Sequence, residues 1–291
     1  NHWDSVWHEH EHYQEGKQIV LQGVKDGIFR KLEDGAILTD VSAYNLSDTV
    51  LLKNDGTSLY ITQDIALTAL KKNLYHADKL LWVIGPEQTL AMKQLFAVCD
   101  QMGIGKLADF THVPYGYVGL KDMDGGFKKM SSREGTVVLI DDVIDAAKQI
   151  ILRRLKENKE WIDADLDELS EKMAVAAVKF SILKPERTQN IVFDVDQSIE
   201  TKGDSGIYVL YTYARIQSVM AKRQIKEIDG FTANQQSQEG DLLRLLLFFP
   251  ETIKKSKTDF SAHHITQYLL EVCASFNNWY AKEMIVDGSS Q

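Results

Sequence analysis

The stretch Lys128–Thr136 (KKMSSREGT) separates two parts of the sequence that differ in character. Before it, short apolar runs rich in strand-forming residues alternate with helical patterns, and this alternation predicts a parallel α/β sheet with crossover helices. The apolar run Val137–Ile140 comes directly after it, and from Asp141 onward the patterns are almost all helical. The sequence therefore predicts an α/β domain followed by an all-α helical bundle.

The composition of Lys128–Thr136 suits a polyphosphate ligand. It combines three cationic side chains with serine hydroxyls and a glycine. Lysine is a compact point charge and arginine a planar fork, so together they can follow charge that moves during phosphoryl chemistry. The alternative is a solvated basic turn at the surface, and the stretch by itself does not decide between the two.

Bulk composition excludes several classes of protein. At 291 residues the chain is long enough for two or three domains with real cores. The net charge of −9 predicts no general affinity for nucleic acid, so we expect no DNA partner, and a tRNA would need local basic patches. No apolar run is long enough to span a membrane. Cys99 and Cys273 read as buried free thiols of a reducing compartment, which predicts a cytoplasmic protein.

The alternation His8–His12 (HEHEH) is the one sequence pattern that suggests a metal site. In a helix His8 and His12 would lie one turn apart, a spacing that zinc can use. No further Cys or His cluster completes four ligands nearby, so we predict no protein-bound metal.

The first part of the chain is expected to contain three helices and several short strands. Residues 54–57 (NDGT) carry a strong tight-turn signal between two strands. Predicted helices cover 15–32, 63 or 64 to 72, and 89–102, with Leu90, Leu95, Phe96 and Val98 as core positions of the last; predicted strands cover 36–39, 50–52, 58–62 and 80–85.

Ligands of parallel sheets bind at the carboxyl ends of the strands, which places Tyr60, Asp64, Gly85 and Gln88 near one rim. Asp64 can accept two charge-assisted hydrogen bonds from a guanidinium, and Gln88 can add an orienting amide. Without a ligand, Asp64 reads as the N-cap of the helix that begins there, and Tyr60 as a half-buried strand aromatic.

Residues Lys129–Arg133 resemble the second signature, Lys-Met-Ser-Lys-Ser, of class I aminoacyl-tRNA synthetases, and the adjoining residues Glu134–Leu139 resemble the arginyl-tRNA synthetase form of the segment after that signature. Ser132 stands where the signature has its second lysine. In that family the loop is a mobile clamp on ATP, and Gly125-Gly126 reads as its hinge. The resemblance implies ATP contacts from Lys129, Met130, Ser131, Ser132 and Arg133, of which Lys129, Ser132 and Arg133 are the catalytic residues that stabilise the pyrophosphate leaving group.

A second resemblance concerns the rim. Asp55–Thr57 with Tyr60–Ala66 is similar to the arginyl-tRNA synthetase stretch Asp-Gly-Thr…Tyr-x-Thr-Arg-Asp-Ile-Ala, with Gln63 at the position of the usual arginine. It implies that Tyr60, Asp64 and Gln88 hold arginine. His112, in Phe110–Val118, falls in a stretch that lines the adenine side of the ATP pocket in the family; alternatively it caps a strand.

The second part of the chain reads as a helical stem and bundle. Tyr208–Ile216 resembles the family helix that opens the anticodon-binding domain, although Leu210 replaces a common glutamine. Tyr211, Tyr213 and Arg215 on it are the predicted tRNA contacts, because aromatic and arginine side chains stack unpaired bases; packing is the alternative for both tyrosines. Predicted helices cover 141–161, 169–183, 208–226, 241–249 and 263–280, with an extended segment at 191–196, a polar loop at 227–240, and Lys254, Lys255 and Lys257 between the last two helices, placed to meet phosphate.

Parts of the family pattern are absent from the chain. None of the eight histidines forms the first class I signature, a His-x-Gly-His turn, and the family's N-terminal module and first half of the nucleotide fold are missing. We therefore expect a fragment, inactive or weakly active alone. Its predicted domains are the second half of a Rossmann-like nucleotide-binding domain (1–140), a helical stem (141–203) and an α-helical anticodon-binding domain cut at its end (204–291).

The prediction is an arginine–tRNA ligase fragment. By resemblance, the full enzyme uses ATP with Mg²⁺ to activate L-arginine, transfers it to the 3′ end of tRNA(Arg), and is monomeric and cytoplasmic. The first alternative is a non-catalytic module that binds tRNA or a protein. The second is a synthetase for another basic or polar amino acid, since an unpaired buried Asp64 would disfavour an apolar one.

Overall fold

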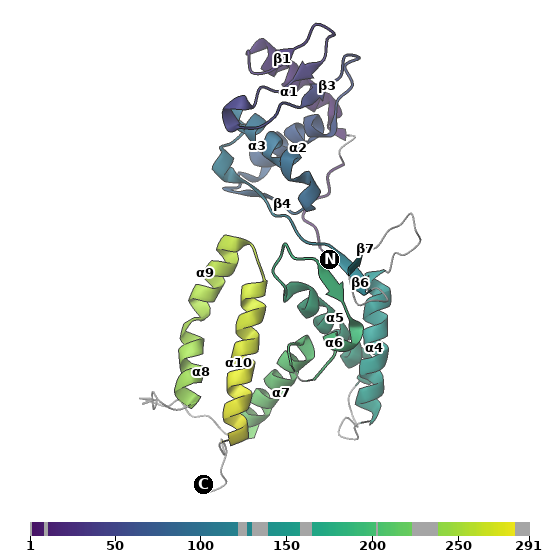
Figure 1. Ribbon diagram of the computed structural model, residues 1–291, viewed down its shortest axis with the longest axis vertical. Coiled ribbons are helices and arrows are strands. Elements are labelled where there is room, and N and C mark those ends of the chain that lie inside the picture. The colour runs from purple at the N-terminus through teal and green to yellow at the C-terminus, as the bar shows by residue number, and fades with distance from the viewer. Residues whose placement is uncertain are drawn as a thin grey trace. The chain divides into compact units, whose positions relative to one another are not determined.

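The structure is a computed structural model that describes residues 2–8, 11–121, 127–129, 139–157, 165–201, 203–222 and 238–282. The chain divides into two compact units, residues 1–115 and 116–291 (Figure 1), and each is described by itself.

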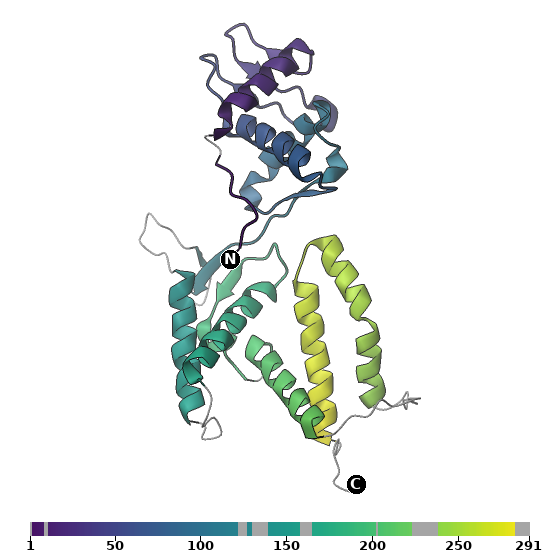
Figure 2. The same cartoon turned by 180° about the vertical axis from the view of Figure 1, so that it is seen from behind.

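The first unit combines three helices with two small sheets. An antiparallel sheet has the order β1-β2-β3, and β4 pairs in parallel with β5 through the crossover helix α3. Helices α1 and α2 lie side by side (Figure 2). The elements are α1 (Tyr13–Lys25), β1 (Arg30–Lys31), β2 (Ile37–Leu38), β3 (Val50–Leu52), α2 (Tyr60–Tyr75), β4 (Leu80–Trp82), α3 (Thr89–Gln101) and β5 (Phe110–His112), with short 3₁₀ turns η2 (Ser42–Tyr44), η3 (Pro86–Gln88) and η4 (Leu107–Asp109).

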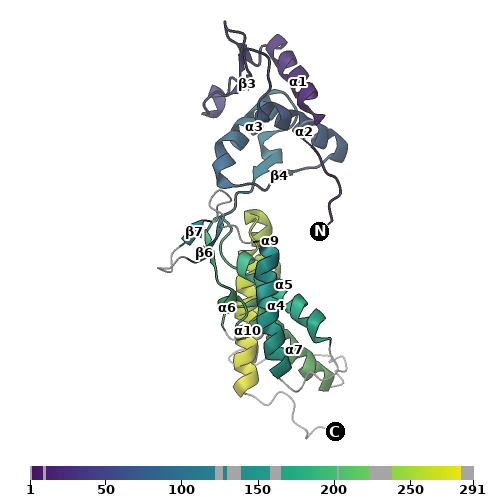
Figure 3. The same cartoon turned by 90° about the vertical axis from the view of Figure 1, so that its right-hand side faces the viewer.

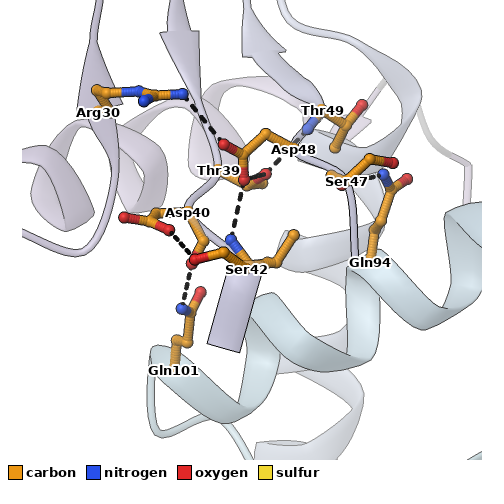
Figure 4. A network of polar contacts seen from close by, with 10 residues as sticks. Arg30, Thr39, Asp40, Ser42, Ser47, Asp48, Thr49, Gln94 and Gln101 are labelled. Carbon is orange, nitrogen blue, oxygen red and sulfur yellow. Dashed lines mark hydrogen bonds and ion pairs between the residues drawn. The ribbon is translucent and has the colours of Figure 1, made fainter. Parts of the chain in front are cut away.

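One hydrophobic core joins the three helices, β2, β3 and the parallel pair β4 and β5. Buried side chains from α1, β3, α2 and α3, among them Val20, Leu51, Ile65 and Leu95, meet the aromatic side chains of the parallel pair. The loop between β2 and β3 is fixed by polar contacts instead (Figure 4).

Asp48 is the centre of that polar network. Its carboxylate accepts hydrogen bonds from the Val41 backbone N–H (2.9 Å) and the Arg30 guanidinium (3.1 Å). Gln94 and Gln101 of α3 donate to backbone carbonyls of the same loop, at 2.7 and 2.6 Å. The network therefore holds the loop on α3 by satisfying backbone groups that no strand pairs with.

Four predictions for this unit are wrong. Residues 58–62 do not form a strand, because α2 begins at Tyr60, so Asp64 is inside the helix and is not its N-cap. The first helix ends at Lys25 instead of residue 32, since Gly27 takes a left-handed conformation (φ +72°). Leu90 is exposed and does not belong to the core. The turn at 54–57 is confirmed, with Gly56 at φ +77°.

The second unit begins with a three-stranded sheet of order β7-β6-β8, in which β6 and β8 are parallel, and continues as helices. Helices α4 and α5 pack side by side (Figure 3), α7 packs on α5 and α10, and α10 packs on α8 and α9. The elements are β6 (Val118–Lys121), β7 (Phe127–Lys129), α4 (Ile140–Glu157), α5 (Leu166–Leu183), β8 (Ile191–Phe193), α6 (Val195–Ser198), α7 (Gly206–Lys222), α8 (Gln238–Leu247), α9 (Phe249–Asp259) and α10 (His263–Lys282).

The predicted fold class, an α/β part followed by an all-α part, is confirmed. Two local features differ from the prediction. Lys254, Lys255 and Lys257 lie between α8 and α10 as expected, but on a helix, α9, that was not predicted, and the extended segment predicted to reach 196 ends at Phe193. Most of the predicted loop 227–240 lies outside the described residues.

Candidate functional site

The start of α2 presents Tyr60 and Asp64 one helical turn apart, so both lie on the same face. Leu59 before them is extended (φ −101°, ψ 170°) and gives the helix no side-chain cap. Tyr60 is 78% exposed and Asp64 is half-buried. Neither of the two ligand-free alternatives, a strand aromatic and an N-cap, describes these positions.

A buried thiol lies behind Asp64. The Thr68 hydroxyl donates a hydrogen bond to the backbone carbonyl of Asp64 (2.6 Å) and contacts Cys99 of α3. Burial raises the pKa of the Cys99 thiol to about 12; the Thr68 hydrogen bond acts in the opposite direction, and the negative charge of Asp64 adds to the rise. The Asp64 carboxylate is thus close enough to α3 for its negative charge to affect the buried Cys99 thiol.

Gln88 and His112 lie at the carboxyl end of the parallel pair, where α/β sheets bind ligands. His112 is paired in register with Trp82, and its Nε2 lies 3.2 Å from the Ile84 carbonyl oxygen. Gln88 ends the 3₁₀ turn η3 and is exposed. The predicted strand-capping role of His112 is therefore compatible with the geometry, and one ring nitrogen is left for another contact.

The residue pairs Tyr60–Asp64 and Gln88–His112 adjoin the same hydrophobic core. Ile61 and Ile65, beside Tyr60 and Asp64, pack in the same cluster as Trp82 and Ile84, beside His112. That all four predicted side chains contact one ligand stays a prediction.

The cationic loop lies mostly outside the described residues. Lys129 is the last residue of β7, and its backbone pairs with Gly119. Met130, Ser131, Ser132 and Arg133, like Gly125 and Gly126, are not among the residues described. The predicted ATP and catalytic contacts of this loop stay predictions.

The aromatic face of α7 is built around Arg215. Its guanidinium carbon lies 4.6 Å from the centroid of the Tyr211 ring and 4.8 Å from that of Tyr280 in α10. It also donates to the Tyr211 hydroxyl (2.7 Å) and to the Asn277 amide oxygen. Arg215 is therefore held between two rings by cation–π attraction as well as by hydrogen bonds.

Sequence reasoning missed Asn277 and Tyr280, since only the fold brings α10 to α7. Asn277 also donates to the Thr212 hydroxyl (2.7 Å) and the Tyr208 hydroxyl (3.1 Å), so it joins three residues of α7. Tyr211 and Tyr213 are 51% and 60% exposed, so neither is a core residue. Of the three predicted tRNA contacts, the structure joins Tyr211 with Arg215; Tyr213, two residues away, points elsewhere on the helix.

Among the residues that the structure describes, no group of three or more His, Cys, Asp or Glu side chains could hold a metal ion. No helix within the described ranges is long and apolar enough to cross a membrane.

Two family models together match nearly the whole chain. The model for the catalytic domain of class I (R) tRNA synthetases matches residues 8–195, and the model for the DALR anticodon binding domain matches residues 209–291.

Curated relatives agree with these matches. The arginine–tRNA ligase of Levilactobacillus brevis is 35% identical over 278 residues, which cover 94% of this chain and 48% of the relative. That of Treponema denticola is 32% identical over 98% of this chain and 49% of its own length. The chain spans about half the length of the curated relatives it matches.

Solved structures show the same fold. Thermus thermophilus arginyl-tRNA synthetase superposes with a TM-score of 0.78 at 23% identity, over 97% of this chain and 52% of that one. The Plasmodium falciparum arginyl-tRNA synthetase gives 0.76 at 24% identity, over 94% and 47%.

Proposed function

We propose that this chain, which belongs to the class I arginyl-tRNA synthetase family, is the part of an arginine–tRNA ligase that holds arginine, one side of ATP and the tRNA. The observation that carries the proposal is Asp64, a half-buried carboxylate one turn from an exposed tyrosine within the matched catalytic segment. A partly desolvated carboxylate binds a guanidinium through two parallel charge-assisted hydrogen bonds.

In this proposal Asp64 accepts from the arginine guanidinium, while Tyr60 and Gln88 orient it. The amino acid's carboxylate oxygen then forms a bond to the α-phosphorus of ATP as the bond to the bridging oxygen breaks, and pyrophosphate leaves with its electron pair. Lys129, Ser132 and Arg133 stabilise the charge that develops on pyrophosphate, an electrostatic role that needs no proton transfer.

His112, Met130 and Ser131 complete the proposed nucleotide contacts. Mg²⁺ is proposed to arrive bound to the ATP phosphates, as is usual where a protein offers few carboxylate ligands. It would supply charge neutralisation on the phosphates.

The second step and the partner rest on the same premise. A ribose hydroxyl at the 3′ end of tRNA(Arg) attacks the carbonyl carbon of arginyl-adenylate, and AMP leaves. Tyr211 and Tyr213 would stack unpaired bases of the tRNA, beside the positive charge of Arg215. We propose cytoplasmic location and a monomeric state for the whole enzyme on the same basis, and the domain boundaries at 140 and 203 remain proposals.

Calorimetric titration of L-arginine into this chain tests the proposal. We expect binding to the wild type that weakens at least 100-fold in Asp64→Ala, because the fork of charge-assisted hydrogen bonds is lost, which corresponds to about 2.7 kcal/mol. Asp78→Ala is the matched control, since Asp78 is an exposed carboxylate of the same unit. L-Citrulline, which has the same shape without the positive charge, should not bind.

Arginine binding that survives Asp64→Ala would contradict the assignment of Asp64. Retention of a tRNA(Arg) transcript on a filter by a chain that binds no arginine would favour the non-catalytic module instead.

A further inference from the structure

We propose that Thr62 is a positioning residue of the arginine site, because its hydroxyl ties the first turn of α2 to strand β3 and thereby fixes Tyr60 and Asp64. This inference rests on the proposed function for the identity of the ligand. The tie itself rests on hydrogen bonds and packing that need no ligand.

The anchor is a buried hydrogen bond between two elements. Thr62 is 0% exposed, and its hydroxyl donates to the backbone carbonyl of Leu51, the middle residue of β3, at 2.6 Å. The backbone N–H of Leu59 donates to the same oxygen at 3.3 Å. Two donors from the start of α2 thus converge on one carbonyl of the strand.

The anchor stands where a helix normally needs one. The first N–H groups of a helix lack intrahelical acceptors, and a polar N-cap side chain usually accepts from them. Leu59 at the N-cap position of α2 gives no such bond. The Thr62 hydroxyl therefore stabilises the end of the helix from the side, by attaching it to the sheet.

Helix α1 closes the other side of the same residue. A Cβ added at Gly16 would lie 2.3 Å from the Thr62 backbone oxygen, so the two helices touch through their backbones there. A glycine inside a helix costs about 1 kcal/mol relative to alanine, and close backbone approach is the usual reason for it. Thr62 is fixed by β3 on one side and by α1 on the other.

The placement of Thr62 explains how this acts on the site. Tyr60 lies two residues before Thr62 and Asp64 two residues after it, and a step of two residues turns about 200° around a helix. Tyr60 and Asp64 therefore share the face opposite Thr62. Thr62 does not reach a ligand on that face, but any shift of the first turn moves both side chains that would.

The test compares three substitutions. Thr62→Val removes the hydroxyl at nearly equal volume, and the Leu51 carbonyl keeps its hydrogen bond from Leu59, so the variant folds. Thr62→Ser restores the hydroxyl. Thr68→Val is the matched control: it removes an equally buried hydroxyl from the same helix, and this hydroxyl bonds to the Asp64 carbonyl within α2 and contacts Cys99 of α3 instead of β3.

We expect arginine affinity to fall about tenfold in Thr62→Val, which corresponds to about 1.4 kcal/mol. Thr62→Ser and Thr68→Val should stay within about twofold of the wild type, a difference well under 1 kcal/mol. A Thr62→Val variant that binds as well as the wild type, or a Thr68→Val variant that loses as much, would overturn the positioning role.

Hydrogen exchange tests the tie without any ligand. The amides of residues 64–66 should exchange about tenfold faster in Thr62→Val and unchanged in Thr68→Val, because the first turn loses its attachment. If the wild type binds no arginine, the proposed function of this chain fails while the exchange result still decides the anchor. Equal exchange in all variants would refute it.

Discussion

Two helices, α2 and α7, carry the same pattern with opposite charge, at the first turn of α2 and in the middle of α7. In α2 it is Tyr60 followed one turn later by Asp64, and in α7 it is Tyr211 followed by Arg215. In α7 the cation is enclosed, because α10 adds the ring of Tyr280 and the amide of Asn277. In α2 the residue that is enclosed is Thr62, on the face opposite the acid.

The difference teaches what a helical spacing can and cannot say. Positions four apart share a face, so both patterns bring a tyrosine beside a charge. The neighbouring element decides whether that charge is used inside the protein. Arg215 joins α7 to α10, whereas the hydroxyl that joins the first turn of α2 to β3 belongs to Thr62, between Tyr60 and Asp64.

The largest expected effect is a loss of stability in the first unit alone, from a substitution where α1 contacts α2. Gly16→Ala should destabilise the first unit by about 3 kcal/mol, because the new methyl group overlaps the Thr62 backbone oxygen and one helix must move. Hydrogen exchange measured at increasing urea concentrations would give the unfolding free energy of each unit separately. Gly103→Ala is the control: no atom lies within 4 Å of its Cβ, so only the left-handed backbone (φ +68°) opposes it, at about 1 kcal/mol. If Gly16→Ala and Gly103→Ala lost the same amount of stability, the close contact between Gly16 and Thr62 would be contradicted.

The second largest expected effect is a loss of stability in the second unit, from a substitution that removes the hydrogen bonds between α10 and α7. Asn277→Ala should cost the second unit about 2 kcal/mol, because Arg215 loses an acceptor and the hydroxyls of Tyr208 and Thr212 lose a donor. Thermal melting measures it. Asn278→Ala, one position along the same helix and exposed, should stay within about 0.5 kcal/mol of the wild type. If Asn278→Ala matched Asn277→Ala, the bridge would not be what holds Arg215.

A third experiment separates packing from binding on α7. Tyr213→Ala should weaken tRNA(Arg) binding about fivefold, because one base-stacking side chain is worth about 1 kcal/mol or more, and leave the melting temperature unchanged. Arg215→Lys should lower the melting temperature, since an ammonium cannot reproduce the planar contacts with both rings. Filter binding and melting of both variants give the answer. The reverse outcome would make Tyr213 the packing residue.

The smallest effect concerns pH and compares one ion pair from each unit. The Lys72 ammonium, 2.8 Å away, and the backbone N–H of Lys106 hold the pKa of Asp109 below its usual range. Because the folded pKa is below the unfolded value of about 4, this stabilisation is present above pH 4 and is lost as the pH falls. In a plot of melting temperature against pH, Asp109→Asn should reduce the fall of the first unit's melting temperature below pH 4, and Asp78→Asn should not.

Lys148 in the second unit behaves in the opposite sense. Hydrogen bonds from its ammonium to Asp167 and Glu171 raise the Lys148 pKa. The contribution of the ammonium to stability is therefore present below the unfolded pKa of about 10.4 and is lost as the pH rises past the folded pKa. Raising the pH through the Lys148 pKa should therefore destabilise the second unit, and a melting series from pH 9 to 12 that leaves its stability unchanged would contradict this.

Much of the fold was predictable where local signals agree. Residues 54–57 form the predicted turn because Gly56 can adopt the left-handed conformation and the Asp55 side chain accepts from the Thr57 N–H (2.8 Å). Helix α3 begins where predicted, just after Pro86 has opened a turn. The predicted core positions Leu95, Phe96 and Val98 are buried, within a run of six consecutive buried residues from Gln94 to Cys99.

The misses have physical causes. Tyr60–Thr62 are strand formers, but the Thr62 bond to Leu51 makes a helix start there, and no local signal carries a contact eleven residues away. Helix α9 ends at Asp259, and Phe260 then takes a left-handed conformation (φ +48°), where glycine is the usual stop signal. Of the site, the sequence motif supplied Tyr60, Asp64 and Gln88 as candidates, but Asn277 and Tyr280 depend on the packing of α10 against α7.

The chain has two cysteines, and the fold places one in each unit: Cys99 in α3 and Cys273 in α10, both buried. Burial raises the pKa of both thiols, so neither is a thiolate at neutral pH while its surroundings are closed. An alkylating reagent can then react only when a unit opens. The mass of each labelled peptide would count those openings separately, so the unmodified protein already contains a reporter of local unfolding for each half.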